Sequence, residues 1–174
     1  MMKRTSIAAL ALSAAALVGI ISEEGFTENA VIPVKNDRPT VGFGSTFRED
    51  GTPVRMGDTI TPGQAVKRTL THINKDEQGL KRCVTGPMSQ VEYDILVNFS
   101  YQYGVRRTCE SDMVLNTNAG DYEAACRAYT QYRRVDKYDC STLINGKPNK
   151  RCWGVWTRSL ERRDKCLAAQ KGLQ

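Results

Sequence analysis

Asp37-Arg38-Pro39-Thr40-Val41-Gly42-Phe43-Gly44-Ser45-Thr46 is the stretch that decides the fold. Its β-prone residues, Thr40, Val41 and Phe43, interleave with glycines, which is typical of a short strand that leads into a turn. Just downstream, Asp50-Gly51 lies between residues 46–48 and 52–54, a pattern that predicts a β-hairpin. The sequence therefore predicts one small β element here rather than a large sheet.

Signals for helices dominate the rest of the chain. Thr61-Pro62-Gly63-Gln64 supplies an N-cap, a proline at the first helical position and a capping-box glutamine, which predicts a helix to about Arg82. A second capping box spans residues 89–92, and Gly104 is placed to end the helix that follows. Asp121 is expected to cap a further helix, and residues 154–173 form the last one. The pattern predicts an α+β fold with a small β-hairpin lobe and a mainly helical lobe.

Composition limits what the protein can be. The chain has 174 residues, which is enough for one domain or a little more, and its 40% hydrophobic and 25% charged residues are typical of a globular protein. A net charge of +6 suits a polyanionic partner, but it lacks the dense basic block of a nucleic-acid binder. His72 is the single histidine, so acid–base chemistry must rest on carboxylates, cysteine, lysine or tyrosine.

The N-terminus has the pattern of an export signal. Lys3 and Arg4 precede an uncharged, alanine-rich stretch over residues 7–21, which as a helix would measure only about 22 Å, less than the roughly 30 Å hydrocarbon core. One interpretation is a signal peptide cleaved after residues 14–16. Another is a segment, residues 1–22, that anchors temporarily and then leaves the bilayer to pack on the protein, because a short alanine-rich helix is held weakly by lipid. A permanent membrane span is a third.

Six cysteines follow this segment. An even number of cysteines behind an export signal indicates disulfides in an oxidising compartment. The sequence contains no C-x-x-C motif, so a zinc ribbon or a thioredoxin-like redox site is a poor fit. Proximity favours Cys140–Cys152, the helical positions of Cys126 and Cys166 make a second pair plausible, and Cys83–Cys109 would remain. The sequence leaves the other connectivities open.

Two carboxylates lie in unlike surroundings. Glu24 follows the apolar segment, where burial would favour its protonated form, whereas Asp37 is flanked by Lys35 and Arg38 and is expected to be ionised. Cleavage of a glycosidic bond needs such a pair, one carboxyl to protonate the leaving oxygen and one to act on water or the sugar. By composition alone the signal is weak, because neighbouring carboxylates are usually solvated surface.

The order and spacing of several motifs resemble the phage lysozyme family of endolysins (glycoside hydrolase family 24). The matching stretches are Glu24-Gly25-Phe26, the decisive stretch from Asp37, the Thr61-Pro62 helix start, and residues 90–101 and 116–126. The resemblance covers about residues 20–170. It implies a lysozyme-like fold without a metal or organic cofactor. It also implies a monomeric muramidase that hydrolyses the β-1,4 bond between N-acetylmuramic acid and N-acetylglucosamine in the glycan strands of peptidoglycan, causing host lysis.

The resemblance also implies a catalytic triad of Glu24, Asp37 and Thr40. Glu24 would be the general acid, Asp37 would hold water or stabilise the transition state, and Thr40 would position the water. The sequence departs from the family at the second member, because Val34 stands where the commoner pattern has Asp, six residues before the Thr. Asn36 and Thr46 are therefore alternatives to Asp37.

The apolar start directly before Glu24 further resembles the signal-arrest-release subgroup of these endolysins. The implied organisation is a signal-anchor over residues 1–22 and a catalytic domain over 23–174. The protein would be exported to the host periplasm, tethered transiently to the inner membrane through residues 7–21, and then released. Two other functions remain open. One is a lytic transglycosylase that cleaves the same bond, and the other is a non-catalytic, disulfide-stapled wall-binding or toxin domain.

Overall fold

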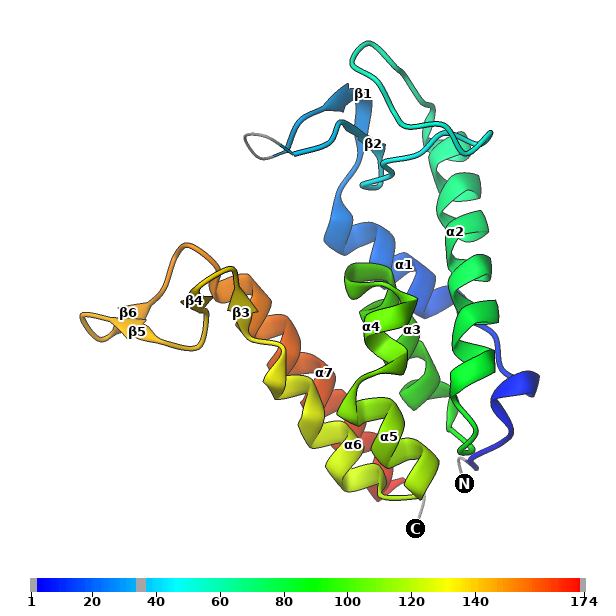
Figure 1. Ribbon diagram of the computed structural model, residues 1–174, viewed down its shortest axis with the longest axis vertical. Coiled ribbons are helices and arrows are strands. Elements are labelled where there is room, and N and C mark those ends of the chain that lie inside the picture. Colours follow the sequence, from blue (N-terminus) through cyan, green and yellow to red (C-terminus); the bar gives the residue numbers. More distant parts are fainter. Residues whose placement is uncertain (1–2, 34–36, 173–174) are drawn as a thin grey trace. The chain divides into compact units, whose positions relative to one another are not determined.

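The computed structural model describes residues 3–33 and 37–172, and Figure 1 shows its helices and strands. The helices are α1 (Ala14–Glu24), α2 (Pro62–Cys83), α3 (Gln90–Tyr103), α4 (Val105–Cys109), α5 (Asp112–Ala119), α6 (Tyr122–Ala128) and α7 (Trp153–Lys171), with short 3-10 helices η1 (Ile7–Ala9) and η2 (Tyr129–Gln131). The strands are β1 (Thr27–Val31), β2 (Thr40–Gly42), β3 (Arg134–Val135), β4 (Tyr138–Asp139), β5 (Leu143–Ile144) and β6 (Lys147–Pro148). The predicted mainly helical fold with small β-hairpins is confirmed.

The chain divides into two compact units. We call Met1–Ala11 together with Gly79–Gln174 the helical unit, and Leu12–Gln78 the β unit. The β unit contains α1, β1, β2 and most of α2. The boundary falls within α2, so one continuous helix contributes to both units.

The β unit contains the small β element that the sequence predicts. β1 and β2 pair antiparallel, with Thr27 opposite Gly42 and Val31 opposite Thr40. The hairpin expected around Asp50-Gly51 is present, because Phe47 pairs with Pro53. Its apolar core consists of six buried residues, Ala30, Val41, Phe43, Val54, Ile60 and Ala65.

Local capping places the helix starts where the sequence predicts them. At the start of α2, the Gln64 side chain accepts from the backbone N–H of Thr61 at 3.0 Å, and the Thr61 hydroxyl accepts from the N–H of Gln64 at 3.3 Å. Ser89 and Glu92 form the same reciprocal pair at the start of α3, which Gly104 ends. Asp121 caps α6 through the N–H of Ala124. These contacts satisfy backbone donors that a helix start leaves unpaired.

The core of the helical unit is built on α3. Phe99 is fully buried and stacks on Tyr103 with ring centroids 4.5 Å apart, while Tyr132 meets its ring edge-on at 4.6 Å. The last helix, α7, differs from expectation in one respect. Its basic residues are not all on the outside, because Arg162 is buried and donates to Asn98 Oδ1 at 2.9 Å and Gln102 Oε1 at 2.7 Å.

Three disulfides join the six cysteines: Cys83–Cys109, Cys126–Cys166 and Cys140–Cys152. These are the pairs that the sequence favours among the connectivities it leaves open. The Cys140–Cys152 disulfide encloses the β5–β6 hairpin, and the β3–β4 hairpin lies directly before it. The sequence does not predict either hairpin, because each strand has only two residues. The disulfides indicate an oxidising, extracytoplasmic location.

The N-terminal segment is not one helix over residues 7–21. The 3-10 helix η1 covers Ile7–Ala9, and α1 begins only at Ala14, where the Ser13 side chain accepts from the N–H of Ala16 at 3.2 Å. This serine cap fixes the later start of the helix. Within residues 3–33 and 37–172, none of the helices combines the length and the apolar character needed to cross a bilayer.

Candidate active site

Glu24 is the last residue of α1, and Gly25 ends that helix with a φ of 69°. Glycine fits this left-handed conformation, which strains a residue that carries a Cβ. Phe26 follows and packs on Phe43, with ring centroids 5.5 Å apart. Contrary to the expectation of burial beside the apolar helix, the Glu24 side chain is exposed.

A tight turn over residues 41–45 lies against the Glu24 carboxylate. Val41 and Ser45 exchange two backbone hydrogen bonds of 3.0 and 3.1 Å, and Gly44 within the turn has a φ of 73°. A Cβ placed on Gly44 would lie 3.1 Å from Glu24 Oε2. Since glycine has no Cβ, the backbone of the turn can approach the carboxylate this closely.

The other glycine of the turn, Gly42, faces α2. Its φ is 70°, and a Cβ there would lie 3.0 Å from the Cβ of Ala65 and 3.5 Å from Ile60 Cγ2. The two glycines thus serve two close approaches, one to the helix and one to Glu24. The Gly-Phe-Gly sequence that suggested a turn also sets the position of the candidate acid.

Thr40 and Asp37 lie on the segment that leads into this turn. Thr40 begins β2, is half-buried, and its hydroxyl donates to the Val31 carbonyl at 3.4 Å. Asp37 is exposed, and its Oδ1 accepts from the N–H of Arg38 at 2.7 Å. The three residues expected to form the triad therefore all belong to the β unit, with Glu24 at the end of α1 and Thr40 at the start of β2.

The alternatives to Asp37 fare differently. Asn36, like Val34, lies outside the described residues. Thr46 lies in the hairpin, where its backbone carbonyl accepts from the N–H of Val54 at 2.9 Å and its side chain is half-buried. This backbone contact places Thr46 in the hairpin, and its role as an alternative to Asp37 stays a prediction.

Sequence reasoning missed the ion pair that braces the β unit. Arg48 donates to both Asp58 oxygens, at 2.7 Å from Nε and 2.6 Å from Nη2, and the N–H of Arg55 donates to the same carboxylate at 3.0 Å. The hydrogen bonds from Arg48 lower the pKa of Asp58 to about 2. The Asp58 carbonyl also accepts from the N–H of Ala30 in β1 at 2.9 Å. Asp58 thus links the hairpin to β1. The sequence around Arg48 and Asp58 gives no signal that these two side chains form an ion pair.

The part of the chain that the structure describes contains no group of three or more His, Cys, Asp or Glu side chains placed to hold a metal ion. The chemistry available in the β unit is that of exposed carboxylates, a threonine hydroxyl and the backbone of a glycine-rich turn. Such a set can donate a proton and hold water beside a neutral polymer bond.

Several solved structures with a similar fold are phage endolysins. The endolysin from Escherichia coli O157:H7 phage FAHEc1 superposes with a TM-score of 0.75 and 27% identity over 92% of this chain and 96% of its own. A point mutant of P22 lysozyme gives 0.71 at 22% identity over 91% of this chain and 99% of its own. The active form of P1 phage endolysin Lyz gives 0.67 at 15% identity over 97% of each.

Sequence comparison agrees with the structural one. The endolysin of Salmonella phage P22 is 27% identical over 99 residues, which cover 57% of this chain and 68% of that protein. The sequence profile of the family described as phage lysozyme matches residues 21–151.

The fold and the β unit with its exposed carboxylates define a lysozyme-like glycoside hydrolase. The match over most of the chain is more specific, and this protein belongs to the phage lysozyme family. It is an endolysin that hydrolyses peptidoglycan and thereby lyses the host cell.

Proposed function

We propose that the protein is a muramidase that hydrolyses the β-1,4 bond between N-acetylmuramic acid and N-acetylglucosamine. Glu24 protonates the leaving oxygen, Asp37 holds water or stabilises the transition state, and Thr40 positions that water. The observation that carries this proposal is the approach of the Gly44 backbone to Glu24, where a Cβ would lie 3.1 Å from Oε2. Contact with this turn restrains the position of a carboxylate that is otherwise exposed.

Exposure of Glu24 in the free protein is compatible with this role. A glycan strand bound over Glu24 would exclude water from the carboxylate, and that exclusion strengthens interactions within the site. Its proton could then pass to the glycosidic oxygen rather than to solvent. The family resemblance implies an inverting reaction, for which we expect the two carboxyl groups to be about 6.5–9.5 Å apart in the substrate complex.

The direct test is Glu24→Gln, with Glu23→Gln as its matched control. Both residues are exposed at the end of α1 and lose the same charge. Loss of the general acid should lower the rate of peptidoglycan hydrolysis by roughly 10²–10⁴-fold, whereas the control should retain nearly full activity. Equal activity of the two variants would instead favour a non-catalytic wall-binding or toxin domain.

The second carboxylate is tested by Asp37→Asn against Asn36→Ala. We expect the first change to abolish most of the hydrolysis and the second to leave most of it. The opposite order would transfer the water-handling role to Asn36. Mass analysis of the products separates hydrolysis, which yields reducing ends, from lytic transglycosylation, which yields 1,6-anhydro ends and uses no water.

We further propose that residues 1–22 are a signal-anchor and that 23–174 are the catalytic domain. The chain would be exported to the periplasm, be held at the inner membrane by residues 7–21, and become active once this segment leaves the bilayer. The support is the short, alanine-rich character of the segment and the position of Glu24 directly behind it, at the end of α1. A membrane-tethered form with full lytic activity would contradict this, as would an equally active mature protein that begins after Ala16.

A further inference from the structure

The first residues of the described chain pack on the helical unit. Thr5 and Met88 exchange two backbone hydrogen bonds, each 2.9 Å long. The Gln90 side chain donates to the Ala11 carbonyl at 2.8 Å, and Ile7 between these contacts is buried. Residues 3–11, which carry the positive end of the export signal, are thus an integral part of this unit.

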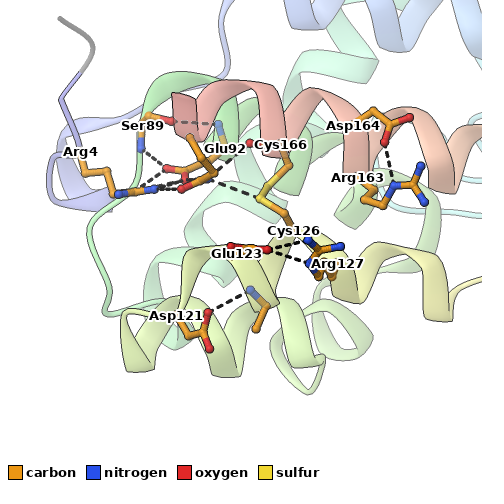
Figure 2. Close-up of a disulfide and its surroundings, with 12 residues drawn as sticks. Arg4, Ser89, Glu92, Asp121, Glu123, Cys126, Arg127, Arg163, Asp164 and Cys166 are labelled. Atoms are coloured by element: carbon orange, nitrogen blue, oxygen red, sulfur yellow. Dashed lines mark hydrogen bonds and ion pairs between the residues drawn. A yellow bond between two sulfur atoms is a disulfide. The ribbon is translucent and has the colours of Figure 1, made fainter. Parts of the chain in front are cut away.

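Arg4 makes the most specific of these contacts, and Figure 2 shows its guanidinium directed at the Glu92 carboxylate. The Arg4 Nη2 atom lies 2.8 Å from Glu92 Oε1, and Nε lies 3.1 Å from Oε2. Arg4 Nη2 also donates to the Gln170 side-chain oxygen. The guanidinium carbon lies 3.4 Å from the centre of the Tyr122 ring, where a cation–π contact forms.

Glu92 is a buried anion, and the protein surrounds it with donors. Its side chain is only 4% exposed, and it also accepts from the N–H of Ser89 at 2.7 Å and from Gln170 Nε2 at 2.5 Å. Burial raises the pKa of Glu92, but the hydrogen bonds from Arg4, Ser89 and Gln170 together outweigh this and leave the pKa below its usual value. A buried carboxylate that stays ionised is costly unless a cation neutralises it.

Glu92 borders a small cavity whose lining is mostly apolar. The cavity has a volume of about 10 Å³, and its lining includes Met88, Leu96, Met113 and Cys166 together with the polar residues Thr117, Tyr122 and Tyr129. None of these lining residues carries a positive charge that could neutralise the carboxylate. Among the contacts of Glu92 in the described chain, the one full positive charge comes from Arg4.

We propose that Glu92, Gln170 and Tyr122 form a guanidinium-binding site whose ligand is Arg4 of the chain's own signal segment, and that its occupation drives this segment out of the membrane. The second half rests on the proposed function, in which residues 7–21 first lie in the bilayer. Positive residues that precede such a segment stay on the cytoplasmic side. Arg4 would then be separated by the membrane from the exported Glu92, and the site would lack its cation until the segment is released.

Membrane insertion of the segment and binding of Arg4 to Glu92 therefore exclude each other. Whatever binds one of two states shifts the equilibrium toward that state by its differential affinity. The buried pair, the cation–π contact and the Thr5–Met88 pairing all form only after release. Weakening the site should consequently retain more of the chain in the membrane, even when the signal segment itself is unchanged.

The decisive variant is Glu92→Gln in the full chain, because it leaves the signal segment and its affinity for lipid intact. The glutamine oxygen can still accept from Ser89, so the helix cap is retained. We expect the ratio of membrane-bound to released protein, measured by fractionation of expressing cells, to rise by about tenfold or more. Glu123→Gln is the matched control, since it removes an exposed carboxylate from the same unit, and it should leave the ratio unchanged.

A second pair of variants changes the signal segment itself. Arg4→Ala and Lys3→Ala each remove one positive charge from it, but Arg4 is half-buried in the site and Lys3 is exposed. In the released protein, hydrogen exchange at the amides of Thr5 and Met88 should accelerate by about tenfold or more in Arg4→Ala and Glu92→Gln, and remain unchanged in Lys3→Ala.

The outcomes separate the two halves of the proposal. If Glu92→Gln and Arg4→Ala behave like their controls in both measurements, the guanidinium site is overturned. If the exchange rates respond but no variant, nor the unaltered chain, is ever found in the membrane fraction, Arg4 binding stands and the signal-anchor proposal falls. Neither result depends on Glu24, whose role is tested separately by hydrolysis.

Discussion

All three disulfides join residues of the helical unit, whereas the β unit contains no cysteine and carries Glu24, Asp37 and Thr40. The helical unit also contains the Arg4–Glu92 ion pair, whose carboxylate is buried, and an aromatic cluster around Phe99. The β unit relies on a small apolar core and on partly exposed pairs that include Arg48–Asp58. The covalent cross-links thus stabilise the helical unit, while the proposed chemistry lies in the β unit, where a close backbone approach sets the position of Glu24.

The largest effect is expected from removing the disulfide that joins α6 to α7. Its cysteines are 40 residues apart, so Cys126→Ala/Cys166→Ala should lower the free energy of unfolding by about 4 kcal/mol, because the cross-link restricts the unfolded chain. Urea unfolding followed by tryptophan fluorescence measures this, since both tryptophans lie in α7. Peptidoglycan hydrolysis well below the unfolding transition should persist. Loss of hydrolysis in fully folded protein would mean that the cross-links position the site as well.

A second prediction concerns the close approach in the β unit. Gly44→Ala should reduce hydrolysis by about 100-fold, because a Cβ would crowd Glu24 Oε2 and small displacements of a catalytic group are costly. Gly51→Ala is the matched control. Gly51 also has a left-handed φ, 82°, but has nothing within 4 Å of its Cβ position. Both variants should lose similar stability, and only the first should lose activity. Equal activities would remove the argument that the turn positions Glu24.

The sequence predicts features that depend on neighbouring residues. Capping residues predict the starts of α2 and α3, and the glycine spacing predicts the turn over residues 41–45, because these structures form within a few positions along the chain. Proximity favours Cys140–Cys152 and helix position makes Cys126–Cys166 plausible, but the sequence does not exclude the other connectivities. The candidate triad came from the family resemblance, and its assignment to Asp37 stays a prediction.

Features that depend on distant partners were not predictable. β1 has only Ala30 buried among its five residues, so it lacks the alternation that marks a strand. Buried Arg162 donates to the side-chain amides of Asn98 and Gln102, which lie 64 and 60 residues earlier in the sequence. Arg4 and its partner Glu92 are 88 residues apart in the sequence. Exposure of Glu24 was missed for a related reason, since the apolar character of α1 does not tell which way its last side chain points.

The third prediction addresses the ion pair of the β unit. Because the pKa of Asp58 in the folded chain is about 2, below its unfolded value, the pair stabilises the protein above about pH 4 and loses this contribution as the pH falls through 2. Asp58→Asn should therefore lower the melting temperature by a few degrees at pH 7, and the difference from the unaltered chain should vanish near pH 2. Calorimetry across this range measures it. A difference that is independent of pH would attribute the effect to packing of the hairpin instead of charge.

The smallest effect is expected at the exposed pair Glu123–Arg127 of α6, whose side chains are 66% and 63% exposed. Glu123→Gln should change the free energy of unfolding by no more than about 0.5 kcal/mol, because solvent screens such pairs and ordering two long side chains offsets the attraction. The same substitution at the buried Glu92 should cost several times more, although both residues lie in the helical unit and each meets an arginine. Urea unfolding of the two variants side by side measures the ratio. Equal losses would mean that burial adds nothing to the Arg4–Glu92 pair, and this ion pair would then no longer distinguish the helical unit from the β unit.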